Sequence, residues 1–226
     1  MFSINKRTLH VLYREAPDAA HTVIMAHPYL ADAHQFFLKR GYPDMYLELG
    51  CNVVLFDFNG FGRSPFDDFA YEKDSAMAAN FATLRFPATK LIGHGISFGG
   101  SNTITYATKN PHGVSRFIIE NVLDSNLSYY KKRNIKLYRL MRVLMNLSGR
   151  INANHDYVKA SALMKHKGAL FIYNDEDDLT TLAMGQQLFE SCPEPKSLAV
   201  FHGKHLEAYP NSPDLYRQTI RNFIFG

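Results

Sequence analysis

The segment Gly93–Gly100, which reads Gly-His-Gly-Ile-Ser-Phe-Gly-Gly, most constrains how this chain can fold. A short apolar run, Thr89–Ile92, precedes it, and Ser101–Lys109 follows as a stretch that can form a helix until Pro111 ends it. A serine on a sharp strand-to-helix turn needs glycine on both sides, because the backbone segments approach too closely for Cβ atoms. The segment therefore predicts that Ser97 is presented as a nucleophile above the edge of a sheet. The alternative is an ordinary glycine-rich turn.

Predicted strands and helices alternate along nearly the whole chain. Continuous apolar runs such as Thr22–Ala26 and Asn52–Phe56 are typical of strands buried on both faces of a parallel sheet. We therefore expect an α/β fold with a mostly parallel central sheet and helices on both faces. The expected strands are 8–13, 22–26, 52–56, 89–92, 114–122, 169–173 and 197–201, and the expected helices are 33–49, 74–85, 101–109, 182–190 and 215–225, with 125–166 mostly helical.

Length and composition predict one domain, 1–226, with a sizeable core, since 46% of the 226 residues are hydrophobic. A net charge of +4 is too small to indicate a nucleic-acid partner. Cys51 and Cys192 have no metal-binding or redox spacing and are expected to be free thiols. With no long apolar run and no signal-peptide pattern, we expect a cytoplasmic protein without stable membrane insertion.

The carboxyl ends of the predicted strands carry the candidate functional residues, because ligand sites of parallel sheets form there. Strand 22–26 is followed by His27–Leu30, strand 169–173 by Asn174–Asp178, and strand 197–201 by His202–His205. With Ser97, these segments supply a serine, an acid and a histidine in that chain order.

These motifs resemble those of the α/β-hydrolases, and the resemblance covers roughly residues 8–225. The family pattern G-x-S-x-G-G matches Gly95–Gly100, and D-x-R-G-x-G-x-S matches Asp57–Ser64, with Asn59 in place of arginine. The acid loop G-x-x-D matches Asn174–Asp177, with asparagine in place of glycine, and G-x-H matches Gly203–His205.

The resemblance implies a catalytic triad in which Ser97 attacks an acyl carbonyl, His205 accepts its proton and Asp177 orients the histidine. For the acid, three alternatives stay open: Asp175, Asp178 and Asp124. His202 is the alternative to His205. His27 and His94 are expected to have structural roles.

Two backbone N–H groups are expected to stabilise the oxyanion of the reaction. One belongs to Phe98, the residue after the nucleophile. The other should come from the loop after strand 22–26, where Pro28 has no N–H to donate. Tyr29 is therefore the predicted second donor, with Leu30 behind it. No cofactor or metal is expected, because the sequence lacks H-E-x-x-H, a P-loop and a dinucleotide-binding glycine pattern.

The segment 125–166 is expected to form a helical lid insertion. Residues 131–142 within it contain six basic residues and no acidic one. They indicate either a solvated surface helix or a binding face for an anionic substrate or carrier, such as an acyl carrier, a coenzyme-A phosphate or a lipid head group. Its apolar side chains are candidates for an acyl pocket: Leu137, Leu140, Met141, Leu144, Met145 and Leu147.

The sequence thus predicts a serine hydrolase that cleaves a small-molecule carboxylic ester or thioester. A thioesterase or acyltransferase for carrier-bound acyl chains is the second hypothesis. The contrasting hypothesis is a non-catalytic binding protein on the same fold, which would not need all three triad residues.

Overall fold

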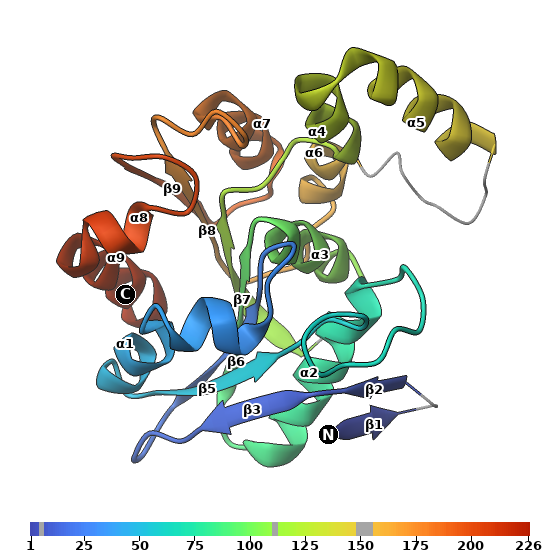
Figure 1. Ribbon diagram of the computed structural model, residues 1–226. Helices are drawn as coiled ribbons and strands as arrows, with labels where there is room; N and C mark the ends of the chain where they lie inside the picture. The colour runs from blue at the N-terminus through green and yellow to red at the C-terminus, as the bar shows by residue number, and fades with distance from the viewer. Residues whose placement is uncertain (5–6, 110–112, 148–155) are drawn as a thin grey trace.

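The computed structural model describes residues 1–4, 7–109, 113–147 and 156–226, and a seven-stranded sheet forms its centre (Figure 1). The strands are β3 (Val11–Arg14), β4 (His21–Ala26), β5 (Cys51–Phe56), β6 (Lys90–Ile96), β7 (Val114–Glu120), β8 (Ala169–Asn174) and β9 (Lys196–Phe201). They lie in the order β3-β5-β4-β6-β7-β8-β9. Only the pairing of β3 with β5 is antiparallel among them. The predicted α/β fold with a mostly parallel sheet is confirmed.

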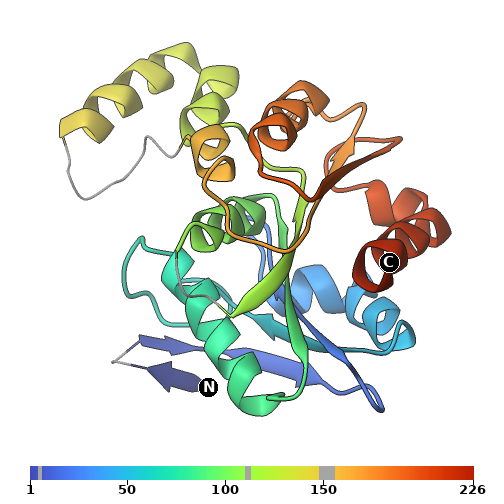
Figure 2. The same ribbon diagram turned by 180° about the vertical axis from the view of Figure 1, so that it is seen from behind.

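Helices cover both faces of this sheet (Figures 1 and 2). On one face lie α2 (Glu72–Arg85), α3 (Phe98–Ala107), α6 (Tyr157–Ser161) and α7 (Leu182–Ser191). On the other face lie the π-helical turn η1 (His34–Leu38) and the helices α1 (Tyr42–Glu48), α8 (Ala208–Asn211) and α9 (Pro213–Phe225). Alternate residues of a strand enter the two cores, as Ile24 and Met25 do, which explains why the strands are apolar throughout.

Two predicted elements are divided in the structure. The expected strand 8–13 is split at His10 between β3 and β2 (Arg7–Leu9), which pairs with β1 (Phe2–Ile4) in a separate two-stranded sheet. The expected helix 33–49 is split into η1 and α1 because Gly41 adopts a left-handed conformation with φ of +75°. Pro43 then lies in the first turn of α1, where the missing N–H costs little.

The segment after β7 forms α4 (Asn126–Arg133), α5 (Ile135–Leu147) and α6. Figures 1 and 2 both show α4 and α5 projecting from the body of the molecule. Residues 148–155, which belong to the predicted lid, lie outside the described residues. No helix in the described parts of the chain is long and apolar enough to cross a membrane.

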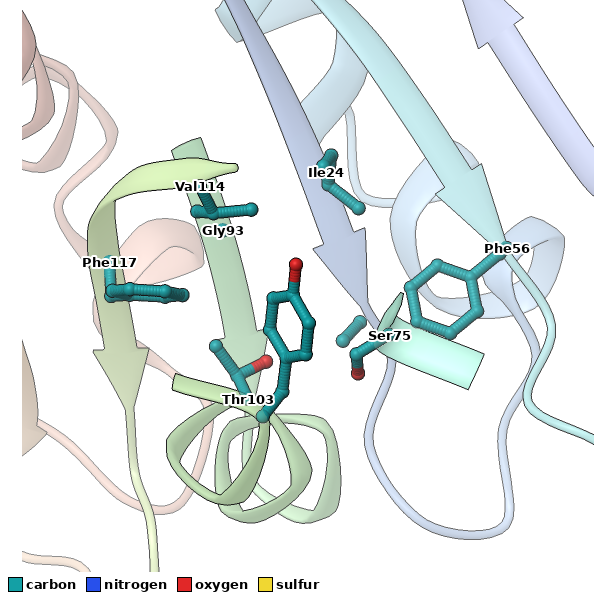
Figure 3. Close-up of a pocket in the computed structure, with 9 residues that line it drawn as sticks. Ile24, Phe56, Ser75, Gly93, Thr103, Val114 and Phe117 are labelled. Carbon is teal, nitrogen blue, oxygen red and sulfur yellow. The ribbon is translucent and has the colours of Figure 1, made fainter. Parts of the chain in front are cut away.

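Two hollows lie away from Ser97. A buried cavity of about 10 Å³ between the sheet and helices α2 and α3 is lined by Ile24, Phe56 and Phe117, with Ser75 and Thr103 from the helices (Figure 3). That is about the volume one water molecule needs, roughly 10–15 Å³. A groove of about 470 Å³ lies at the amino ends of β8 and β9, the edge of the sheet opposite the candidate site.

Candidate active site

Ser97 lies on the turn between β6 and α3, in a backbone conformation that few residues adopt. Its φ is +52° and its ψ is −114°. Its N–H donates to the carbonyl oxygen of Glu120 on the neighbouring strand over 2.8 Å, and its own carbonyl accepts from Ser101 N over 3.0 Å. The surrounding structure thus holds the strained turn in place, as is typical of residues at functional sites.

Two glycines allow this turn. A Cβ atom on Gly99 would lie 2.0 Å from the carbonyl oxygen of Ala26, at the end of β4. A Cβ atom on Gly95 would lie 2.4 Å from Thr103 Oγ1 and 2.6 Å from the Cα of Gly100. The predicted requirement for glycine therefore has a direct cause, which is the close approach of α3 to β4 and β6.

His205 connects the serine to an acid. Its Nδ1 lies 2.6 Å from Asp177 Oδ2, and its Nε2 lies 3.3 Å from Ser97 Oγ. A short contact to a carboxylate assigns the ring proton to Nδ1 and leaves Nε2 free to accept the serine proton. The 3.3 Å separation is slightly long for a hydrogen bond, and catalytic hydrogen bonds can shorten when substrate binds. The structure thus brings together the serine, acid and histidine that the sequence singled out.

Asp177 is buried and kept ionised by its neighbours. Its Oδ1 accepts from the N–H groups of Leu179 and Thr180 over 2.7 and 2.8 Å. Burial acts to raise the pKa of Asp177, but the hydrogen bond and charge of His205, together with hydrogen bonds from Thr180, outweigh it, so the net pKa is lowered. An ionised carboxylate at this position can orient the ring of His205 and stabilise its protonated form.

Two residues that the sequence analysis did not single out also hold the acid. Asn121 Nδ2 donates to Asp177 Oδ2 over 2.9 Å, and the Thr180 hydroxyl donates to the same oxygen and lies 3.1 Å from His205 Nδ1. Asn121 follows β7 with a φ of +48°, a conformation that asparagine tolerates better than most residues. Its position directly after a strand, at the edge where the acid and histidine were expected, is the one sequence signal available.

The alternative candidates for the acid and the histidine contact other residues. Asp175 is exposed and contacts the exposed ring of His202 over 3.3 Å, and it accepts from Gly203 N over 3.1 Å. The hydrogen bond from Gly203 and the contact with His202 lower the pKa of Asp175, and that contact raises the pKa of His202. Asp175 therefore ties down the loop that carries His205. Asp178 is exposed, and the half-buried Asp124 accepts a hydrogen bond from the Ser125 hydroxyl.

Two further histidines, His27 after β4 and His94 on β6, are buried near the site. His27 Nδ1 lies 2.8 Å from the carbonyl oxygen of Pro28, and its Nε2 accepts from Phe58 N over 3.0 Å. Burial lowers the pKa of His27, so it stays neutral and can accept that bond. His94 on β6 lies 2.9 Å from the Tyr46 hydroxyl. Both histidines contact neighbouring backbone or side chains and lie outside the contacts of Ser97.

The side chains of the two residues expected to supply the oxyanion donors pack against each other. The rings of Tyr29 and Phe98 are 5.6 Å apart, and Phe61 packs against both. Within the described residues, neither Tyr29 N nor Phe98 N donates a hydrogen bond to the protein. Leu30, behind Tyr29, has a φ of +58° and is largely exposed.

Of the predicted apolar lid residues, Leu137 and Leu140 are exposed and so do not line a closed pocket. The side chains of Met141, Leu144, Met145 and Leu147 lie outside the described residues.

Comparison with known proteins gives consistent results for the fold. A sequence model described as alpha/beta hydrolase fold matches residues 8–221. An uncharacterized protein of Bacillus subtilis (strain 168), YqkD, is 26% identical over 228 residues, which covers 94% of this chain and 74% of that protein.

Solved structures with the same architecture belong to proteins named for different activities. An esterase from Exiguobacterium antarcticum superposes with a TM-score of 0.72 at 16% identity, over 99% of this chain and 97% of its own. A bromoperoxidase from Bacillus anthracis superposes with a TM-score of 0.68 at 13% identity, over 96% of each chain. At these identities the likeness concerns the fold, so the reaction must be argued from the site.

Proposed function

Because the chain belongs to the alpha/beta hydrolase fold family, we propose that it is a serine hydrolase that cleaves a carboxylic ester or thioester through an acyl-enzyme intermediate. The observation that carries this proposal is the continuous line of contacts from Asp177 through His205 to Ser97. A binding protein on the same fold would have no use for a strained serine aligned with a histidine and a buried carboxylate.

In the proposed first half-reaction, Ser97 Oγ attacks the acyl carbon while His205 Nε2 takes the hydroxyl proton. The π electrons of the substrate carbonyl move onto the carbonyl oxygen, which becomes an oxyanion. Asp177 stabilises the imidazolium of His205 that forms when the histidine takes the proton. When the tetrahedral intermediate collapses, the bond to the leaving alcohol or thiol breaks, and His205 returns the proton to that group. Water then attacks the acyl-enzyme by the same route, which releases the carboxylic acid and regenerates Ser97.

We assign the oxyanion to the backbone N–H groups of Phe98 and Tyr29. Both are free of protein acceptors within the described residues, as donors awaiting a substrate oxygen should be. Phe98 N lies at the first position of α3, so the positive end of the helix also favours negative charge there.

Active-site labelling tests the proposal. We expect the protein to react covalently with a fluorophosphonate probe and Ser97→Ala to lose both labelling and hydrolysis of p-nitrophenyl esters, with a fall in kcat of roughly 10⁴- to 10⁶-fold. The thermal unfolding temperature of the variant should stay close to that of the parent, which shows that the loss is chemical. A folded parent that neither labels nor hydrolyses any ester or thioester would contradict the proposal.

The choice between ester and thioester depends on the leaving group, which is much larger and more negatively charged when coenzyme A carries the acyl chain. Comparing p-nitrophenyl esters with acyl-coenzyme A of equal chain length separates the two classes. A kcat/KM that is higher for the thioester at every chain length would favour the thioesterase.

A further inference from the structure

The positive charge of this protein is concentrated in one segment. Residues 125–155 contain seven of the chain's 25 lysines and arginines and none of its 21 acidic residues. The rest of the chain therefore carries 18 basic and 21 acidic residues, a slight negative excess. Such an asymmetry indicates an anionic partner for the basic segment.

The same segment exposes large apolar side chains. Ile135, Leu137, Leu140 and Val143 of α5 are 52%, 39%, 54% and 55% exposed. Single exposed apolar residues are ordinary on protein surfaces, but four on a thirteen-residue helix are not. Helical spacing places Leu137 and Leu140 on one side of α5 and Arg139 and Arg142 on the other. The helix is therefore amphipathic, and Leu137 and Leu140 on its apolar side are exposed, whereas the exposed Ile135 and Val143 lie on the side of the arginines.

The position of α5 makes this surface accessible. The helix packs against α4 and projects with it from the body of the molecule, as both views show (Figures 1 and 2). The cationic side chains Lys131, Lys136, Arg139 and Arg142 are exposed along the same two helices.

We propose that α4 and α5 dock on an anionic lipid surface, with α5 lying in the plane of the interface. The exposed leucines would enter the boundary between head groups and acyl chains, and the lysines and arginines would contact lipid phosphates. A soluble acidic protein would satisfy the charges but has less use for two leucines exposed on the opposite side of the helix. The proposal does not depend on the triad, because lipid binding can be measured without hydrolysis.

Vesicle co-sedimentation with the full chain tests the docking. We expect binding to phosphatidylcholine vesicles that contain about 30% phosphatidylglycerol, weak binding to phosphatidylcholine alone, and a loss of binding as salt rises from about 0.05 to about 0.5 M. No binding to the anionic vesicles at low salt would overturn the proposal.

Two variants separate charge from apolar insertion. Lys136→Gln with Arg139→Gln and Arg142→Gln should weaken binding by roughly ten- to a hundredfold. Lys39→Gln with Lys165→Gln and Arg221→Gln removes the same charge from exposed sites elsewhere and should leave most of the binding intact. Equal loss in both triple variants would show that only the net charge matters and would contradict a docking surface on α5.

The apolar contribution is tested with Leu137→Gln and Leu140→Gln, which should weaken binding by about tenfold or more. Leu84→Gln with Leu215→Gln, on exposed positions of α2 and α9, is the matched control and should bind normally. If the variant with both leucines replaced binds vesicles as tightly as the parent, binding depends on charge alone. That result would contradict docking on lipid and favour a soluble anionic partner.

A fluorescent reporter gives an independent measurement, because the chain contains no tryptophan. The emission of Leu140→Trp should shift to shorter wavelength on anionic vesicles, whereas that of Leu84→Trp should not. A Leu140→Trp emission that does not change while the protein is bound would also overturn insertion of α5.

Discussion

Asp175 and Asp177 are two residues apart and contact different histidines. Asp177 is buried against His205 and receives five hydrogen-bond contacts, whereas Asp175 is exposed and contacts His202 and Gly203. In the proposed mechanism the buried acid stabilises the charge that develops on His205, whereas the exposed acid supports a loop. Their contributions to catalysis should therefore differ widely.

We predict that Asp177→Asn lowers kcat by roughly 10⁴-fold, because an amide disfavours the Nδ1-protonated tautomer of His205 and cannot balance its charge. Asp175→Asn should lower kcat by less than about tenfold, because it changes only the support of the loop. Steady-state kinetics on one ester, with thermal melts for both variants, makes the comparison. Similar losses in the two variants would mean that Asp177 is not the triad acid.

Asp68 should make the free energy of unfolding depend on pH in the acid range. Burial acts to raise its pKa, but hydrogen bonds from Arg7, Ala70 and Lys73 and the charge of Arg7 lower the pKa of Asp68 to about 2. A carboxyl whose pKa is lowered by folding stabilises the protein above its unfolded pKa and loses this effect as pH falls through the folded pKa. Because its side chain is 39% exposed, solvent screening keeps the effect modest.

We therefore expect the stability difference between the parent and Asp68→Asn to be largest above pH 4 and to shrink as pH falls toward 2. Urea unfolding at several pH values measures it. In the Arg7→Gln background, which lacks the main charge partner, the same substitution should show little pH dependence. A difference that stays constant with pH would contradict the assignment.

At the scale of elements, the turn that carries Ser97 depends on the close packing of α3 against the end of β4. Alanine is a better helix former than glycine by about 1 kcal/mol, so propensity alone favours Gly99→Ala. The clash with the backbone of Ala26 at 2.0 Å opposes it, and a backbone carbonyl cannot rotate away as a side chain can. The clash should outweigh the helix propensity, so Gly99→Ala should destabilise the protein.

Gly99→Ala is expected to lower the free energy of unfolding by about 3 kcal/mol and to reduce kcat, because relief of the clash moves the loop that carries Tyr29. Gly168→Ala is the control, since its Cβ would meet Phe223 at an ordinary 3.4 Å, and it should change stability by less than about 1 kcal/mol. Denaturant unfolding and ester kinetics test both. A stable, fully active Gly99→Ala would show that α3 can move away without cost.

At the scale of the whole molecule, Arg7 joins the amino-terminal strands to α2 and to the loop between β5 and α2. Its guanidinium is buried, contacts Asp74 and Asp68 over 2.5 Å each, and lies 3.1 Å from Asp67. Asp74 is fully buried and also accepts from the backbone and side chain of Asn59. Asn59 stands where the family motif has arginine, so the guanidinium in this loop comes from a distant part of the chain.

Arg7→Gln should lower the free energy of unfolding by about 3 kcal/mol or more, because it leaves the carboxylate of Asp74 buried without a cation. Arg14→Gln breaks an exposed pair with Asp44 and should cost less than about 1 kcal/mol. Both are measured by denaturant unfolding, and Arg7→Gln with Asp74→Asn should recover part of the loss. Equal effects of the two arginine substitutions would contradict this role of Arg7.

Features that depend on the local pattern of residues could be predicted without the structure. The apolar runs identified the strands of the parallel sheet, because burial on both faces selects apolar residues at every position. The glycines around Ser97 identified the strand-to-helix turn, because close backbone approach leaves no room for a Cβ atom. The order of serine, acid and histidine at strand ends indicated where a site would form. The division of helix 33–49 at the left-handed Gly41 and the division of strand 8–13 between two sheets were missed, since neither changes the apolar pattern of the segment.

Which of these residues meet depends on contacts between distant parts of the chain. Ser97 and His205 are 108 positions apart, His205 and Asp177 are 28 apart, and Arg7 and Asp74 are 67 apart. Four acidic residues in a row at 175–178 look equivalent in sequence, yet the backbone turn after β8 buries Asp177 against His205 and leaves Asp175 in solvent. Asn121 and Arg7 act through such long-range contacts, because a polar side chain gains its role from the charge or donor that folding places beside it.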